Sequence, residues 1–237
     1  QNAMTLQNRE PEYVRKMVEY VAAASASVSD PTQREQGFDK AVQLAEYAAS
    51  LTPADANARF NVGHAYLLWA QSTADQTRRN NLLARAAQNY QRATQINPNA
   101  PDYYVEWALA SQLAGQSDEV VMAALNQALQ LDPRNPDAYF GLGRMYQARN
   151  ELDNAEQAYL KGLAADPNST RVAPAYAALG EIYVKSNKLD QALQASKQAA
   201  DLAPTSWVNR LNLALVYQRV GRGSEALTEA QTAYNLA

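Results

Sequence analysis

Five prolines recur at nearly constant spacing along the chain, and each follows an apolar stretch. They are Pro53, Pro98, Pro133, Pro167 and Pro204, separated by 45, 35, 34 and 37 residues. Proline lacks a backbone donor and disfavours the α conformation in the residue before it, so each proline marks a helix end followed by a turn. Helix ends at a nearly constant period predict a repeat architecture.

Residues 136–169 form the clearest repeating unit. Gly143 and Ala155 are small where two antiparallel helices must approach closely, and larger side chains fill the space beside that contact. The unit resembles the 34-residue tetratricopeptide repeat. The resemblance is carried by Tyr139, Leu142, Gly143, Tyr146, Ala155, Tyr159 and Pro167, with Gly162 in place of the usual alanine.

The turn between paired helices repeats its own chemistry. Glycine or asparagine recurs at one position, and these residue types tolerate the left-handed conformation that ends a helix. Three residues later a residue able to cap the next helix recurs, for a gain of about 1 kcal/mol each. The first set is Gly115, Asn150, Asn187 and Gly221, and the second is Asp118, Asp153, Asp190 and Ser224.

The family resemblance implies an all-α fold, a right-handed superhelical solenoid of about six helix-turn-helix repeats. We expect residues 1–8 to be a tag remnant or disordered lead and residues 9–237 to form one solenoid. The unit 56–99 carries about ten surplus residues, which predict longer helices or an enlarged loop. The expected repeats are 9–53, which is degenerate, 56–99, 101–135, 136–169, 173–206 and 207–237.

Composition limits the partners. The formal net charge is −3, whereas nucleic acids and anionic membranes attract clustered positive charge. There is no apolar run long enough to insert into a membrane, so we expect a soluble segment. Cysteine is absent, which fits a reducing or an oxidising compartment. A cytoplasmic or an extracytoplasmic domain of a larger bacterial protein would fit equally.

No motif in the sequence predicts catalysis. There is no glycine-rich phosphate-binding loop, and His64 is the only histidine, so no two-histidine metal site can form. A lone histidine acting as a base would still need a positioned nucleophile and an orienting group. We therefore expect no enzyme activity, no catalytic or metal site and no cofactor.

The resemblance also implies a binding surface. In tetratricopeptide proteins the first helices of successive repeats line a concave groove, so we expect a scaffold that binds a peptide or protein segment there. Alternatively, several of the apolar residues at these positions pack between repeats. The groove candidates are Phe60, His64, Val105, Leu109, Phe140, Arg144, Gln147, Glu181, Leu211, Leu215 and Arg219.

Three further readings stay open. The chain also resembles, in composition only, the soluble repeat tails of bacterial membrane polysaccharide polymerases and ligases, which would make it an accessory tail. Arg78, Arg85 and Arg92 share one helix face and would meet either an acidic partner or solvent. The last unit has no polar capping helix, so its apolar face predicts self-association or a chain that continues past Ala237.

Overall fold

The computed structural model describes residues 11–237, which form twelve α-helices arranged as six successive pairs. The expected lead over residues 1–8 lies outside the described residues. The helices are α1 (Pro11–Ala26), α2 (Pro31–Leu51), α3 (Ala56–Ser72), α4 (Gln76–Ile96), α5 (Pro101–Leu113), α6 (Asp118–Leu131), α7 (Pro136–Ala148), α8 (Leu152–Ala165), α9 (Val172–Lys185), α10 (Leu189–Leu202), α11 (Trp207–Arg219) and α12 (Gly223–Leu236).

The all-α prediction is confirmed, and so are the predicted helix ends and turns. Each of the five recurring prolines directly follows the C-cap residue of a second helix, as at Thr52 before Pro53. The four residues expected in the left-handed conformation all adopt it. Their φ angles are 73° at Gly115, 59° at Asn150, 56° at Asn187 and 76° at Gly221.

The predicted second-helix caps are wrong. Asp118 lies one residue after the cap position, Asp153 and Asp190 lie two residues after it, and no side chain caps these helices. Their carboxylates stand near the positive end of the helix dipole, which gives a smaller stabilisation than a cap hydrogen bond. Side-chain caps occur instead on α2, α3, α4, α7 and α11, and on α7 Asn135 accepts from the Ala138 amide at 2.9 Å.

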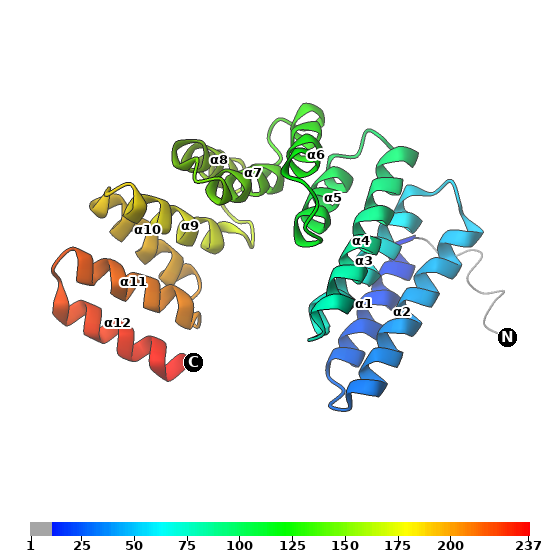
Figure 1. Cartoon of the computed structure of the whole chain (residues 1–237), viewed down its shortest axis with the longest axis horizontal. Helices are drawn as coiled ribbons and strands as arrows, with labels where there is room; N and C mark the ends of the chain where they lie inside the picture. The colour runs from blue at the N-terminus through cyan, green and yellow to red at the C-terminus, as the bar shows by residue number, and fades with distance from the viewer. Residues whose placement is uncertain (1–10) are drawn as a thin grey trace. The chain divides into compact units, whose positions relative to one another are not determined.

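The chain divides into two compact units, α1–α6 up to Pro133 and α7–α12 from Arg134 onward. A single solenoid over residues 9–237 therefore stays a prediction. In the first unit, α1–α4 lie side by side (Figure 1). The surplus residues of 56–99 lengthen the helices rather than the loop, because α3 spans 17 residues and α4 spans 21.

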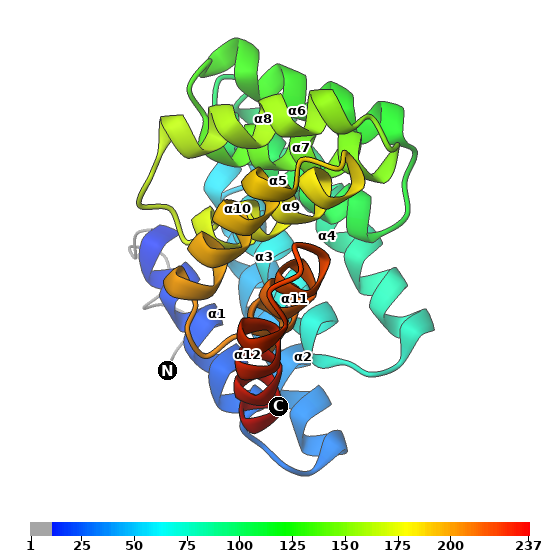
Figure 2. The same ribbon diagram turned by 90° about the vertical axis from the view of Figure 1, so that its left-hand side faces the viewer.

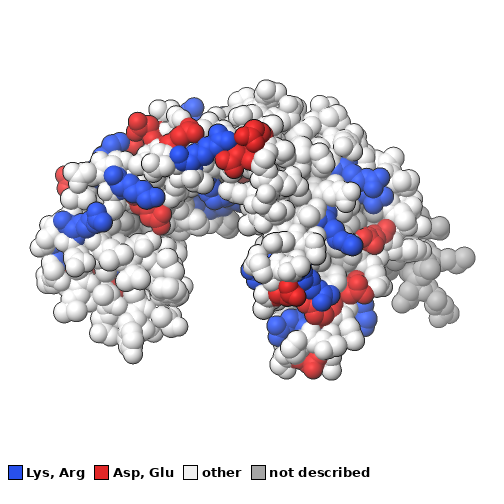
Figure 3. Space-filling view, in the orientation of Figure 1, with Lys and Arg blue, Asp and Glu red and all other residues white. Residues whose placement is uncertain are grey.

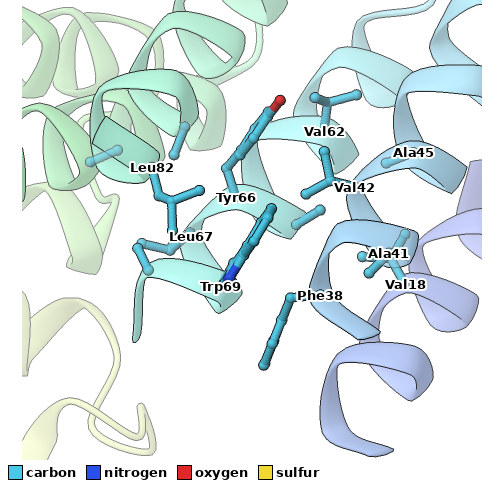
Figure 4. Packing of buried hydrophobic residues seen from close by; sticks show 14 of the residues in the cluster. Val18, Phe38, Ala41, Val42, Ala45, Val62, Tyr66, Leu67, Trp69 and Leu82 are labelled. Carbon is cyan, nitrogen blue, oxygen red and sulfur yellow. The ribbon is translucent and has the colours of Figure 1, made fainter. Parts of the chain in front are cut away.

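Apolar and aromatic side chains from α1–α4 form the core of the first unit (Figure 4). Val18 of α1, Phe38 and Val42 of α2, and Tyr66 of α3 are each at most 4% exposed. Alanines such as Ala41 and Ala45 let the helix axes approach closely. None of these helices could bury its apolar stripe alone, so stability comes from packing between consecutive helices.

The second unit consists of three consecutive helix pairs (Figure 2). Phe140, Tyr159, Leu179 and Ile182 form the centre of one buried cluster, which joins α7 and α8 to α9 and α10. A second cluster joins α10 to α11 through residues that include Ala200. This packing fixes the inner faces of α7, α9 and α11 relative to one another.

The last helix keeps an apolar face in solvent. Leu227 and Tyr234 are 71% and 79% exposed. One repeat earlier, Leu193 and Ala200 of α10 hold the same helix positions and pack against α11. In the view of Figure 3, few charged side chains cover the end of the molecule that α11 and α12 form. The expected uncovered face is therefore present on α12.

Candidate peptide-binding groove

Two hollows lie along the inner faces of α7, α9 and α11 in the second unit. The first has a volume of about 630 Å³ and is lined by residues that include Phe140, Arg144, Gln147 and Glu181. The second has a volume of about 480 Å³ and is lined by Glu181, Leu215 and Arg219 among others. Both hollows are lined by Ala177 and Glu181, so they adjoin each other, and together they are called the inner groove below.

Phe140 forms part of the floor of the groove and is only 2% exposed. Its ring lies over Gly162 of α8, where an added Cβ would stand 2.6 Å from the nearest ring carbon. The glycine that replaces the family's usual alanine therefore makes room for the phenyl ring. Phe140 acts first as a core residue, because so small an exposed surface gives a partner little to contact.

A hydrogen-bonded chain crosses the groove wall from α8 to α9. The Tyr159 hydroxyl donates to Gln147 Oε1 at 3.0 Å, and Gln147 Nε2 donates to Glu181 Oε2 at 3.1 Å. Burial raises the pKa of Tyr159 to about 12, while Arg144 lowers that pKa and Glu181 raises it by smaller amounts. The phenol is protonated at neutral pH, so it fixes the Gln147 amide and does not act as a base.

The α11 side of the groove carries exposed apolar and basic side chains. Leu215 is 51% exposed, and Arg219 and Lys185 lie at the rim in the last turns of α11 and α9. Leu211 is 39% exposed but lines neither hollow.

The four candidates of the first unit line neither hollow. Phe60 is half-buried, with its ring centroid 5.1 Å from that of Tyr90, and Leu109 is also half-buried. Val105 is 5% exposed and belongs to the core. His64 Nε2 stands 3.7 Å from Glu19 Oε1. Burial lowers the pKa of this histidine below its ordinary value, and the nearby Glu19 partly offsets that effect.

The repeat pattern of the sequence does not identify several of the groove residues. Tyr159 holds a signature position of the second helix, and its side chain also lines the groove. Arg171 lies in the connection before α9 and pairs with Asp137 Oδ1 at 2.7 Å. Asn209 donates from Nδ2 to the Ala199 carbonyl at 2.9 Å. The family pattern marks only certain positions of the first helices, so it gives no signal for Arg171 in a connection, for Tyr159 on a second helix, or for the unmarked position of Asn209 on α11.

The arginine stripe on α4 is partly structural. Arg78 pairs with Glu35 Oε2 at 3.0 Å and lies 5.1 Å above the Trp69 ring, whose Nε1 donates to the same carboxylate. Two turns later, Arg85 donates to the Tyr66 hydroxyl at 3.2 Å, and that hydroxyl donates to Glu46 on α2. These contacts tie α4 to α2 across the edge of α3. Arg92 is exposed.

Two other kinds of feature are absent from residues 11–237. No group of three or more histidine, aspartate or glutamate side chains is arranged to hold a metal ion in this part of the chain. No helix of the described residues is long and apolar enough to cross a membrane.

The sequence matches two family models and several curated proteins. Two tetratricopeptide repeat families match residues 113–179 and residues 173–206. Small glutamine-rich tetratricopeptide repeat-containing protein 2 of Mycosarcoma maydis is 34% identical over 84 residues, which cover 35% of this chain and 24% of that protein. Protein adenylyltransferase fic-1 of Caenorhabditis elegans is 35% identical over 77 residues, 30% of this chain and 15% of its own length. The chain thus spans a quarter or less of these relatives.

Solved structures match over most of the chain. The Cut9-Hcn1 assembly of the APC/C matches 96% of this chain and 44% of the compared chain, with a TM-score of 0.71 and 15% identity. TTC0263, a thermophilic repeat protein of Thermus thermophilus, matches with a TM-score of 0.62 and 20% identity. The match covers 88% of this chain and all of the TTC0263 chain. YrrB, described as having an unusual peptide-binding site, matches with a TM-score of 0.52 and 18% identity. The match covers 71% of this chain and 79% of the YrrB chain. At these identities the likeness shows the fold alone. The family matches show tetratricopeptide repeats over residues 113–206, and the solved structures show the same repeat fold over most of the chain.

Proposed function

We propose that this chain is a protein-interaction scaffold whose inner groove holds an extended or helical segment of another protein. The observation that carries the proposal is the pair of adjoining hollows, in which apolar side chains are flanked by polar and charged ones. Apolar anchors supply affinity in such sites, while polar groups fix the register of the bound segment.

The size of the groove suits a short peptide. It crosses three first helices, and an ordinary interaxial distance of about 10 Å gives a length of about 20 Å. An extended chain advances about 3.3 Å per residue, so about six residues would fit. The fixed Tyr159–Gln147–Glu181 chain presents a preorganised polar wall, which lowers the ordering cost of binding.

The chemistry of the groove favours binding over catalysis. No nucleophile there is paired with a base and an orienting group, and the one histidine of the chain, His64, lies in the first unit. The family matches support the same class of function, as does the peptide-binding site that the YrrB structure reports for that protein. The comparisons give no support to an accessory tail in polysaccharide assembly.

The groove of the second unit carries the proposal more directly than the candidates of the first. Phe60, His64, Val105 and Leu109 remain a predicted extension on α3 and α5. Val105 is almost fully buried and Phe60 packs against Tyr90, so any contact there would rest on His64 and Leu109.

Panning a random peptide library of about 12 residues against the purified chain tests the proposal. Ala177, which lines both hollows, would be changed to tryptophan to block the groove. The matched control is Ala164→Trp, at an exposed alanine of α8 outside the groove. Thermal melts would establish that both variants fold. We expect peptides that bind the wild-type chain and the control but not the blocked variant.

If the blocked variant melts early, Leu215→Ala gives a second test, because that side chain is half exposed and its truncation costs little stability. The proposal is wrong if no peptide is enriched, or if the enriched peptides bind wild-type, blocked and control chains equally.

A further inference from the structure

The inner groove differs in charge from the chain as a whole. Four basic residues line it, Arg144, Arg171, Lys185 and Arg219, against the single carboxylate of Glu181. The whole chain carries a formal net charge of −3. A groove lined with one sign of charge raises the local concentration of ligands of the opposite sign. The inner groove is therefore a basic concavity on an acidic protein.

The basic residues are not equally available to a ligand. Arg171 is already paired with Asp137 at 2.7 Å. Arg144 lies near the Tyr159 phenol and lowers its pKa. Lys185 and Arg219 are both exposed, and no carboxylate of residues 11–237 pairs with either of them. The unneutralised positive charge is thus concentrated at the α11 side of the groove.

From this distribution we propose that the bound segment is acidic as well as apolar, with its carboxylates over Lys185 and Arg219 and an apolar side chain on Leu215. This inference rests on the proposed function of the groove. Leu215 lies in the hollow that both basic side chains also line, and it is 51% exposed. An acidic residue next to an apolar one in the partner would satisfy all three side chains.

Glu181 sets the direction of the bound segment. Its carboxylate lies where the two hollows join and accepts a hydrogen bond from Gln147 at 3.1 Å. A second carboxylate placed beside it would be repelled. The acidic residues of the partner therefore lie toward α11, while amide or hydroxyl groups face Glu181 and Gln147.

Lys185 and Arg219 also stabilise the ends of their own helices, because a cation in the last turn complements the helix dipole. That role predicts a change in melting temperature when they are substituted. It does not predict any dependence of peptide binding on the charge of the peptide. The two roles are therefore separable by measuring both quantities on the same variants.

The experiment uses peptides enriched from the random library described above. Each is synthesised in its selected form and with every aspartate and glutamate replaced by the corresponding amide. Both forms are titrated by fluorescence anisotropy against the wild-type chain, against Lys185→Glu/Arg219→Glu and against Lys40→Glu/Arg92→Glu. The last variant makes the same change in net charge at exposed positions outside the groove. Lys185→Gln/Arg219→Gln provides a milder pair if charge reversal disturbs folding.

We expect enriched peptides to be acidic, and the amide forms to bind the wild-type chain about tenfold more weakly. Charge reversal in the groove should cost at least about tenfold for the acidic form, with a change within about twofold in the control. Added salt should weaken the acidic form selectively.

Three results would overturn the inference. If enriched peptides lose their binding in Ala177→Trp but show no dependence on their carboxylates, the groove is a binding site without acidic preference. If the Lys40→Glu/Arg92→Glu control weakens binding as much as reversal in the groove, the effect comes from the overall charge of the chain. If no peptide is enriched at all, the proposed function fails and this inference fails with it.

Discussion

The close approach of Phe140 to Gly162 gives a sharp test of how this repeat is packed. In Gly162→Ala the new Cβ would stand 2.6, 2.7 and 3.1 Å from three carbons of the phenyl ring. The optimal separation of two carbon atoms is about 3.5–4.0 Å. The ring would have to retreat by about an ångström, and a side chain that is 2% exposed has little free space to enter.

Two opposing free energies decide the net effect. Overpacking of a buried site costs about 1–3 kcal/mol. Replacing glycine by alanine inside a helix returns about 1 kcal/mol, because alanine has the higher helix propensity. We therefore expect Gly162→Ala to lower the free energy of unfolding by about 0–2 kcal/mol, with a midpoint of about 1 kcal/mol. In a Phe140→Leu background the ring is gone, so the same change should be neutral or stabilising by up to about 1 kcal/mol.

Urea unfolding followed by circular dichroism would measure all four proteins of this cycle. The predicted coupling between the two sites is about 2 kcal/mol. Gly223→Ala is the matched control, because nothing lies within 4 Å of a Cβ at that position and its backbone is helical. If Gly162→Ala stabilises the chain as much as Gly223→Ala does, in both backgrounds, the packing argument is refuted.

Three further predictions concern other parts of the molecule. Burial raises the pKa of Tyr159 to about 12, so the stability contributed by its protonated hydroxyl is present below the ordinary pKa of 10.0 and is lost as the pH rises toward 12. In Tyr159→Phe, the free energy of unfolding measured across that pH range should therefore lose part of its pH dependence. A pH profile identical to that of the wild-type chain would contradict this assignment. Arg78→Met should lower the free energy of unfolding by less than about 1 kcal/mol, and the loss should be smaller in high salt than in low salt. Arg92→Met should have no effect on thermal melting. Equal effects of the two substitutions would show that the contact of Arg78 with Glu35 and Trp69 is unimportant. We also propose that the exposed apolar face of α12 supports self-association. Sedimentation velocity at increasing protein concentration should then show larger species, and Leu227→Glu/Tyr234→Glu should abolish them. A wild-type chain that stays monomeric at every concentration would rule this out.

The helix ends and turns of the repeats were predictable because they depend on backbone conformation. A residue such as Asn150 at φ 59° belongs to a small set of types that tolerate this conformation, whatever packs around it. The helix-ending prolines are equally local. The caps failed for a related reason, since a one-residue shift moves Asp118 from the cap into the first turn, and propensities do not resolve a single residue.

The depth of each groove residue was not predictable from its place in the repeat. Phe140 and Ala177 are each the fifth residue of their expected repeats, 136–169 and 173–206, and only the three-dimensional packing shows that the phenyl ring lies on Gly162 and is buried. Likewise, the pairing of Arg78 with Glu35 joins residues from different repeats, and one sequence without its fold gives no sign of that contact. A Phe140→Ala variant would therefore report on stability before it reported on binding.

The order of helix contacts has a consequence for how the chain opens. Most packing in each unit is between helices that are consecutive in sequence, and α12 packs chiefly against α11. Such an array can unravel from its end without global unfolding, so the amides of α12 should exchange hydrogen sooner than those of α9 and α10. No residue of α12 lines the inner groove. Fraying of the last helix would then leave every lining residue in place, which separates the fluctuation of this end from occupancy of the groove.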